Sequence, residues 1–121
     1  MISTQEFEIC GKKRGFRFGT YSIRLIEEAT GIKDISKMLE EFTKQNLTFL
    51  SAYFFACAKH YSHSVEKVKV IDYDEADVND WTDELGPEEV GRIAVTLIQQ
   101  YLPKNLTPPA EETGELMKAT A

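Results

Sequence analysis

The stretch FLSAYFFACAKHY, residues 49–61, decides the fold of this chain. On a helix its apolar side chains point in nearly every direction, and only Ser51, Lys59 and His60 interrupt them. A helix that is apolar all round is buried on most sides. The stretch is too short and too close to lysines to span a bilayer, which needs about 20 apolar residues. We therefore expect it to be the central helix of a small domain, with the other elements packed around it.

The composition indicates one globular domain and disfavours nucleic-acid binding. The 121 residues are 42% hydrophobic, which is enough for a single core over residues 1–102, and the formal net charge is −6. The two cysteines, Cys10 and Cys57, lack motif spacing, so we expect reduced thiols in a cytoplasm. We expect no secretion signal, because no N-terminal stretch combines basic residues, an apolar run and a cleavage site.

Residues 5–19 are predicted to form a β-hairpin. Apolar and charged residues alternate in both arms, Phe16 and Phe18 share one face, and the connector of residues 11–14 is polar and basic. An isolated hairpin is only marginally stable in water. Its apolar face should therefore rest on helices or on another chain.

The spacing of apolar residues predicts helices after the hairpin, which makes the fold class α+β, mostly α. The expected helices cover about 20–30, 34–44, 48–62, 74–85 and 87–102. Residues 65–71 are predicted to be a short extended link or an edge strand. Residues 103–121 are rich in Pro, Thr, Glu and Ala, and this composition predicts a disordered tail.

Start and stop signals mark the ends of these helices. Gly31 is predicted to end the first helix, and Asp34 or Ser36 to begin the second. Thr48 is the expected cap of the central helix. Asp74 is the expected cap of the fourth helix, with another aspartate three residues later in a capping-box position.

Residues that could carry chemistry are few. Cys57 and His60 could share a metal ion on one helix face, with His63 nearby, but zinc would need a further ligand and supporting hydrogen bonds that the sequence does not offer. A Cys–His catalytic pair needs a cleft and an orienting group, whereas a cysteine in an apolar helix is usually a core residue. We therefore predict no catalytic residue, no metal, no cofactor and no enzymatic activity.

Residues 72–89 contain no Lys or Arg and form an acidic segment. The segment does not fit a calcium loop, because Ala76 replaces a ligand, Asp77 replaces the turn glycine and Asp83 replaces the final glutamate. Two interpretations remain: an acidic face that keeps the protein soluble, and a surface that docks onto a basic partner.

The only tight basic cluster is formed by Lys12, Lys13 and Arg14. Such a cluster could touch nucleic acid. Three charges beside glutamates on a hairpin are more typical of a solvated turn, which is the interpretation that we prefer. The glycines at each end of the cluster lack the Gly-Lys-Ser/Thr ending of a phosphate loop.

The string RFGTYSIRLIEEATG, residues 17–31, resembles the start of tail assembly chaperones of long-tailed, siphovirus-like bacteriophages and prophages. The resemblance continues through the aromatic stretch of residues 47–61 and reaches the acidic, Trp-containing stretch of residues 78–86. In all it covers about residues 5–102 through short motifs.

This resemblance implies a non-enzymatic role in the host bacterial cytoplasm. Proteins of the family bind the long helical tape-measure protein and keep it soluble. They help to recruit tail-tube subunits, then leave before the virion is complete, and many also exist in a longer frameshifted form. The alternative function is a small prophage-encoded regulatory or nucleic-acid-associated protein, which would need a basic recognition surface. A metal-dependent hydrolase would need clustered ligands.

The expected partners are the tape-measure protein and the tail-tube protein, with homo-oligomerisation left open and no membrane or nucleic acid. The candidate partner-binding residues are the aromatic residues of the hairpin and the acidic and aromatic residues of the fourth helix. They are Phe16, Phe18, Asp74, Asp77, Asp80, Trp81 and Asp83.

Overall fold

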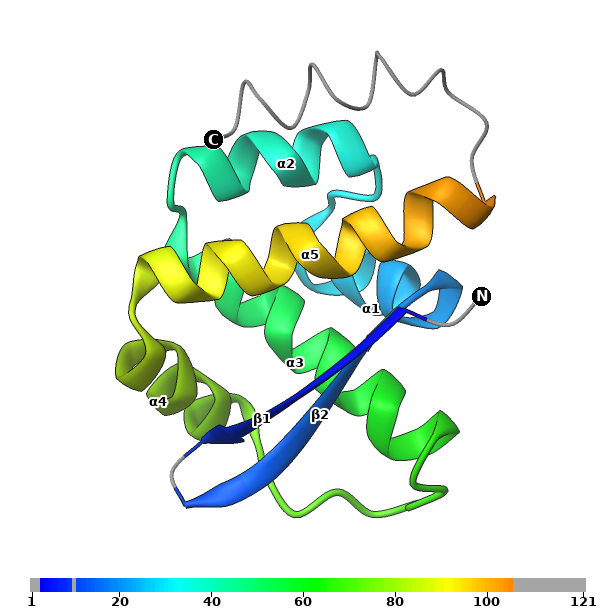
Figure 1. Ribbon diagram of the computed structural model, residues 1–121, viewed down its shortest axis with the longest axis vertical. Helices are drawn as coiled ribbons and strands as arrows, with labels where there is room; N and C mark the ends of the chain where they lie inside the picture. The colour runs from blue at the N-terminus through cyan, green and yellow to red at the C-terminus, as the bar shows by residue number, and fades with distance from the viewer. Residues whose placement is uncertain (1–2, 10, 106–121) are drawn as a thin grey trace.

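The computed structural model describes residues 3–9 and 11–105 of the chain. Within these residues a two-stranded antiparallel hairpin precedes five helices, so the predicted α+β, mostly α, fold is confirmed (Figure 1). The elements are β1 Ser3–Ile9, β2 Lys12–Phe18, α1 Thr20–Thr30, α2 Ile35–Thr43, α3 Leu47–Ser64, α4 Glu75–Leu85 and α5 Pro87–Asn105. Cys10 and residues 106–121, the greater part of the predicted tail, lie outside the described residues.

Helix α3 is the centre of the domain, as its apolar stretch predicts. Figure 1 shows α3 running diagonally through the molecule with α5 crossing it, and its most extensive contacts are with β2 and α1. Its buried apolar side chains include Leu50, Tyr53, Phe54 and Cys57, none of which is exposed at all. No helix among the described residues is long and apolar enough to cross a membrane.

The hairpin is held against α3 by its aromatic side chains. The ring centroid of Phe16 lies 4.8 Å from that of Phe54, and Phe18 stacks on Tyr53 at 5.6 Å. Because two strands alone are marginal in water, this contact with α3 stabilises the hairpin.

A close approach between the hairpin and α3 depends on the absence of a side chain at Gly15. A Cβ atom at this position would lie 2.2 Å from Cε1 of Tyr61. The ring of Tyr61 therefore lies directly on the strand, and its hydroxyl donates a hydrogen bond to Oε2 of Glu6 on β1. Together these contacts attach both strands to the C-terminal half of α3.

The tip of the hairpin is shorter than predicted. Residues 11–14 were expected to form the connector, but Lys12 pairs with Ile9 and Arg14 pairs with Phe7. Gly11 has a φ of 78°, a left-handed conformation that glycine adopts without steric cost, and it lies directly before the paired residue Lys12. The basic side chains therefore lie along β2 and not on a turn.

Three predicted helix signals are found at the expected places. Gly31 ends α1 with a φ of 81°. Asp34 occupies the N-cap position of α2, without a capping hydrogen bond from its side chain. At α4 the capping box is complete: the Asp77 N–H donates to Oδ1 of Asp74 at 3.0 Å, and the Asp74 N–H donates to Oδ2 of Asp77 at 2.9 Å.

The predicted cap of α3 is wrong. The helix begins at Leu47, so Thr48 lies inside the first turn, and Asn46 is the N-cap residue. The Phe49 N–H donates a hydrogen bond to Oδ1 of Asn46 at 3.2 Å. Asn and Thr both cap helices, so the residue at which the turn after α2 ends decides which of them is the cap.

Two other segments differ from the expectation. Residues 65–71 form turns and bends without a strand, and Lys67 has a φ of 60°, so the edge-strand alternative is wrong. Helix α5 continues beyond residue 102 to Asn105. Pro103 therefore lies within the last turn of α5 and does not end the helix where predicted.

Candidate binding groove

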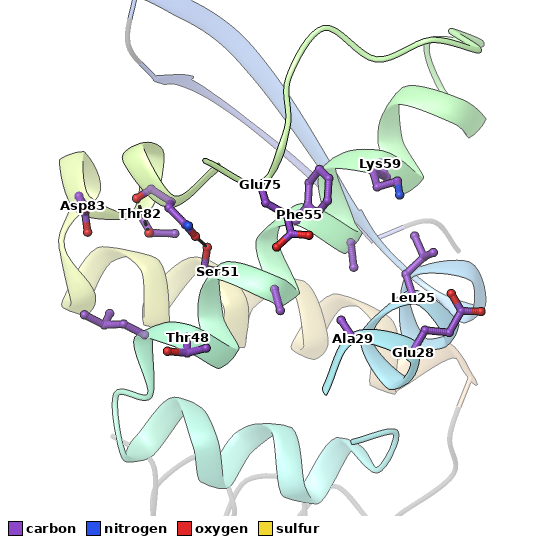
Figure 2. A pocket seen from close by; sticks show the side chains of 14 residues that line it. Leu25, Glu28, Ala29, Thr48, Ser51, Phe55, Lys59, Glu75, Thr82 and Asp83 are labelled. Carbon is purple, nitrogen blue, oxygen red and sulfur yellow. Dashed lines mark hydrogen bonds between the residues drawn. The ribbon is translucent and has the colours of Figure 1, made fainter. Parts of the chain in front are cut away.

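A groove runs along a face of α3 that is left partly open between α1 and α4 (Figure 2). Its volume is about 530 Å³. The floor consists of α3 residues that follow each other at helical spacing, and they are Leu47, Thr48, Ser51, Ala52, Phe55, Ala56 and Lys59. The groove therefore runs parallel to the axis of α3.

The floor of the groove mixes apolar and polar side chains. Ser51 and Ala52 are small and partly exposed, so a bound helix can approach the α3 backbone closely there. Phe55 is half-buried, and the Nζ atom of Lys59 lies 5.0 Å from the centre of its ring. Leu47, at the other end, keeps 45% of its surface exposed.

The walls come from two helices that are far apart in the sequence. Helix α1 supplies Leu25, Glu28 and Ala29. Helix α4 supplies Glu75, Asn79, Thr82 and Asp83, and the hydroxyl of Ser51 donates a hydrogen bond to the side-chain oxygen of Asn79. This bond and the packing of Val78 and Trp81 in the core hold α4 against α3.

The rim of the groove is acidic. Three carboxylates, from Glu28, Glu75 and Asp83, line the groove together with one ammonium group, that of Lys59. Arg24 approaches Glu28 to 3.9 Å, but both side chains are largely exposed and such a pair contributes little. The groove therefore combines a floor of apolar and polar side chains with a net negative rim.

Of the residues predicted to bind a partner, the aromatic ones are buried in the core. Phe16, Phe18 and Trp81 are 0%, 1% and 3% exposed, so in this structure they offer no surface to a partner. Their side chains instead join the hairpin to α3 and α4, with a ring-centroid distance of 6.3 Å between Phe16 and Trp81. Alternating phenylalanines in a strand indicate a buried face, and here the helices of the same chain cover that face.

The predicted acidic residues are all exposed, but they lie in different places: two cap α4, and one lines the groove. Asp74 and Asp77 form the capping box of α4, and their hydrogen bonds are made within the chain. Asp80 is exposed, and Asp83 is the only one of the four that lines the groove. Contact of these carboxylates with a partner stays a prediction.

The basic cluster pairs with the start of the acidic segment. The Lys12 Nζ and Arg14 Nη1 atoms lie 2.5 Å and 3.1 Å from the carboxylate oxygens of Asp72, and hydrogen bonds from these two cations lower the pKa of Asp72. The guanidinium of Arg14 also lies over the rings of Tyr73 and Trp81, at 5.3 Å and 4.6 Å. Lys12 and Arg14 thus share one carboxylate within the protein.

The Cys57, His60 and His63 side chains do not converge. Burial raises the pKa of the Cys57 thiol, which keeps it protonated. Burial, with a smaller contribution from Arg17, lowers the pKa of His60 to about 4, and Nδ1 of His63 lies 2.8 Å from the carbonyl oxygen of Val68. Among the described residues, no three His, Cys, Asp or Glu side chains are grouped so that they could hold a metal ion.

Most groove residues were missed by the sequence analysis. A usable signal existed in α3, because Ser51 and Lys59, which interrupt the apolar stretch, are eight residues apart and therefore share a face with Phe55. The wall residues Leu25 and Ala29 carry no such signal. They become part of the site only because α1 packs beside α3.

Comparison with known proteins gives the chain no relatives. No family model, no curated protein and no solved structure matches it.

Proposed function

We propose that this chain is a tail assembly chaperone that binds helical segments of a phage tape-measure protein. In this proposal it keeps that protein soluble and helps to recruit tail-tube subunits. It acts in the host cytoplasm and is not part of the finished virion. The resemblance of residues 17–31, 47–61 and 78–86 suggests the family, and the groove supplies a binding surface.

The observation that carries the proposal is the open groove between α1 and α4, whose floor presents the apolar side chains of Leu47, Ala52 and Phe55. Amphipathic helices bind proteins by laying their apolar face into a groove of this kind. A tape-measure protein is long and helical, and before assembly it exposes apolar faces that must be covered to prevent aggregation. A groove that takes one short helical stretch at a time fits reversible binding by several chaperone molecules.

The alternative of a nucleic-acid-associated regulator has weaker support. Binding to a phosphate backbone needs unpaired cations gathered on one surface. Lys12 and Arg14 are paired with Asp72, and Lys13 lies 3.1 Å from Glu6. The formal net charge of −6 also opposes approach to a polyanion.

Co-expression with a phage tape-measure protein, taken from the genes next to that of this chain, tests the proposal. We expect the soluble fraction of the tape-measure protein to rise and the two proteins to co-purify. An unrelated acidic protein of similar size, expressed in the same way, is the control for a general effect of expression. An unchanged soluble fraction together with no co-purification refutes the proposal.

A further inference from the structure

We infer that the groove between α1, α3 and α4 receives a cationic amphipathic helix. The helix has one narrow stripe of alanine and medium-sized aliphatic side chains, and it is flanked by Lys or Arg. The inference rests on the proposed function, because the occupant is a segment of the client protein, and it deepens that function by stating the chemistry of the segment. Three features of the groove carry it: length, floor and charge.

The length of the groove matches a short helix. Between Thr48 and Lys59 the α3 backbone rises by about 16 Å, roughly three helical turns. Figure 2 shows these residues in a row along α3, with Glu28 and Ala29 on one side and Thr82 and Asp83 on the other. An extended strand would leave its backbone N–H and C=O groups unpaired over this floor, whereas a helix satisfies its own.

The floor selects a narrow apolar stripe. Packed helices approach to about 8–10 Å between their axes, and the shorter distances require small residues at the contact. Ser51 and Ala52, which are both partly exposed, provide this contact. Phe55 and Leu47 provide larger apolar surfaces toward the two ends, where aliphatic side chains of the ligand can pack.

The charge of the rim selects cations next to that stripe. Glu28 on the α1 side and Glu75 and Asp83 on the α4 side place carboxylates on both walls. The cation among the lining residues, Lys59, lies over the ring of Phe55 near one end. A helix with Lys or Arg on both flanks of its apolar stripe meets opposite charge along both walls.

The same charges disfavour two other occupants. A second copy that presented the same face would bring an acidic rim against an acidic rim. The segment of residues 106–121 has three glutamates, Glu111, Glu112 and Glu115, and only one cation, Lys118. Both of these occupants would face repulsion, whereas a cationic helix would face attraction.

Two synthetic peptides of about 18 residues test the charge selection. They share one leucine–alanine stripe at helical spacing, and the remaining positions are lysine in one and glutamate in the other. Using the full-length protein, we expect isothermal titration calorimetry to show binding of the lysine peptide only. The affinity should decrease when the salt concentration is raised from about 0.05 M to about 0.5 M. Equal binding of both peptides, or no binding of either, overturns the inference.

Variants locate the site. The triple variant Glu28→Gln, Glu75→Gln and Asp83→Asn should weaken binding of the lysine peptide about tenfold. The matched control removes three exposed carboxylates elsewhere, by Glu8→Gln, Glu40→Gln and Glu88→Gln, and should change binding less than about twofold. Equal weakening by both triple variants shows non-specific attraction and overturns the inference.

A second pair of variants tests whether a bulky side chain on the floor of the groove prevents binding when no charge is changed. Ala52→Trp fills the middle of the groove and should abolish binding, whereas Ser36→Trp puts the same side chain on the exposed surface of α2 and should not. Circular dichroism checks that both variants fold. Undiminished binding by a folded Ala52→Trp variant places the helix elsewhere and overturns the inference.

The same variants distinguish failure of this inference from failure of the proposed function. If the wild-type chain co-purifies with the tape-measure protein and Ala52→Trp does so equally well, the chaperone function stands and the groove assignment fails. If the wild-type chain binds the lysine peptide but not the tape-measure protein, the groove assignment stands for another cationic helix and the tape-measure function fails.

Discussion

Replacement of Gly15 by alanine places a methyl group against the ring of Tyr61. The new Cβ would lie 2.2, 2.3 and 2.4 Å from Cε1, Cζ and Cδ1 of that ring, whereas carbon atoms in contact are about 3.5–4.0 Å apart. Gly15 does not have a positive φ, so the backbone itself accepts alanine. The strand is paired with β1 at Glu6, so the aromatic ring has to move.

The loss of stability that we expect from Gly15→Ala has two sources, overpacking of the interior and a broken hydrogen bond. Overpacking of a filled interior costs about 1–3 kcal/mol. Displacement of the ring also breaks the hydrogen bond from the Tyr61 hydroxyl to Glu6. We therefore expect Gly15→Ala to lower the free energy of unfolding by about 1–3 kcal/mol, a large part of the roughly 5–15 kcal/mol of a typical domain.

A double-mutant cycle with Tyr61→Ala isolates the clash. In the Tyr61→Ala background the obstacle is gone, and Gly15→Ala should stabilise by about 0.4–1 kcal/mol, because alanine restricts the unfolded chain. Urea unfolding followed by the fluorescence of the single, buried Trp81 gives all four free energies. If Gly15→Ala has the same effect in both backgrounds, the close approach of strand and ring does not control stability.

The other predictions concern a helix cap and a buried histidine. Asn46→Ala should lower the free energy of unfolding by about 1 kcal/mol through loss of the α3 cap, while Thr48→Ala should change it by less than about 0.5 kcal/mol in the same urea titration; a larger effect at Thr48 contradicts the observed start of the helix. His60, with a pKa of about 4 in the folded protein against 6.5 unfolded, should not affect stability above pH 6.5. Because the unfolded chain binds the proton more tightly, His60 should lower stability increasingly from pH 6.5 down to 4, by about 2 kcal/mol after allowance for solvent screening. His60→Gln should remove this part of the pH dependence, and an NMR titration that places the pKa of His60 near 6.5 refutes the reasoning.

Local signals were sufficient for most of the fold. The alternation in the hairpin, the apolar stretch of residues 49–61, and the glycine and aspartate at Gly31 and Asp74 predicted the order of the elements and the central helix. These signals work because each depends on a backbone conformation or on a periodicity that neighbouring residues set by themselves. The errors lie at element boundaries and connections: the hairpin connector, the cap of α3, the 65–71 link and the end of α5, where adjacent signals compete.

Pairings between distant residues could not be predicted in this way. Arg14 and Asp72 are 58 positions apart, and no pattern in either segment indicates that they meet. Without that contact, the basic strand and the acidic segment are two separate charged surfaces. With it, Asp72 is paired with the basic strand, while the other aspartates of the segment stay exposed.

By itself the sequence determined that an apolar helix is central, that a phenylalanine-rich hairpin must be covered, and that the protein is acidic. Only the tertiary structure decided which aromatic residues are covered within the chain and which face of α3 stays open. The reason is geometric: a groove exists where α1 and α4 stop short of meeting across α3. The spacing of three packed helices depends on all of their side chains together, and no single segment encodes it.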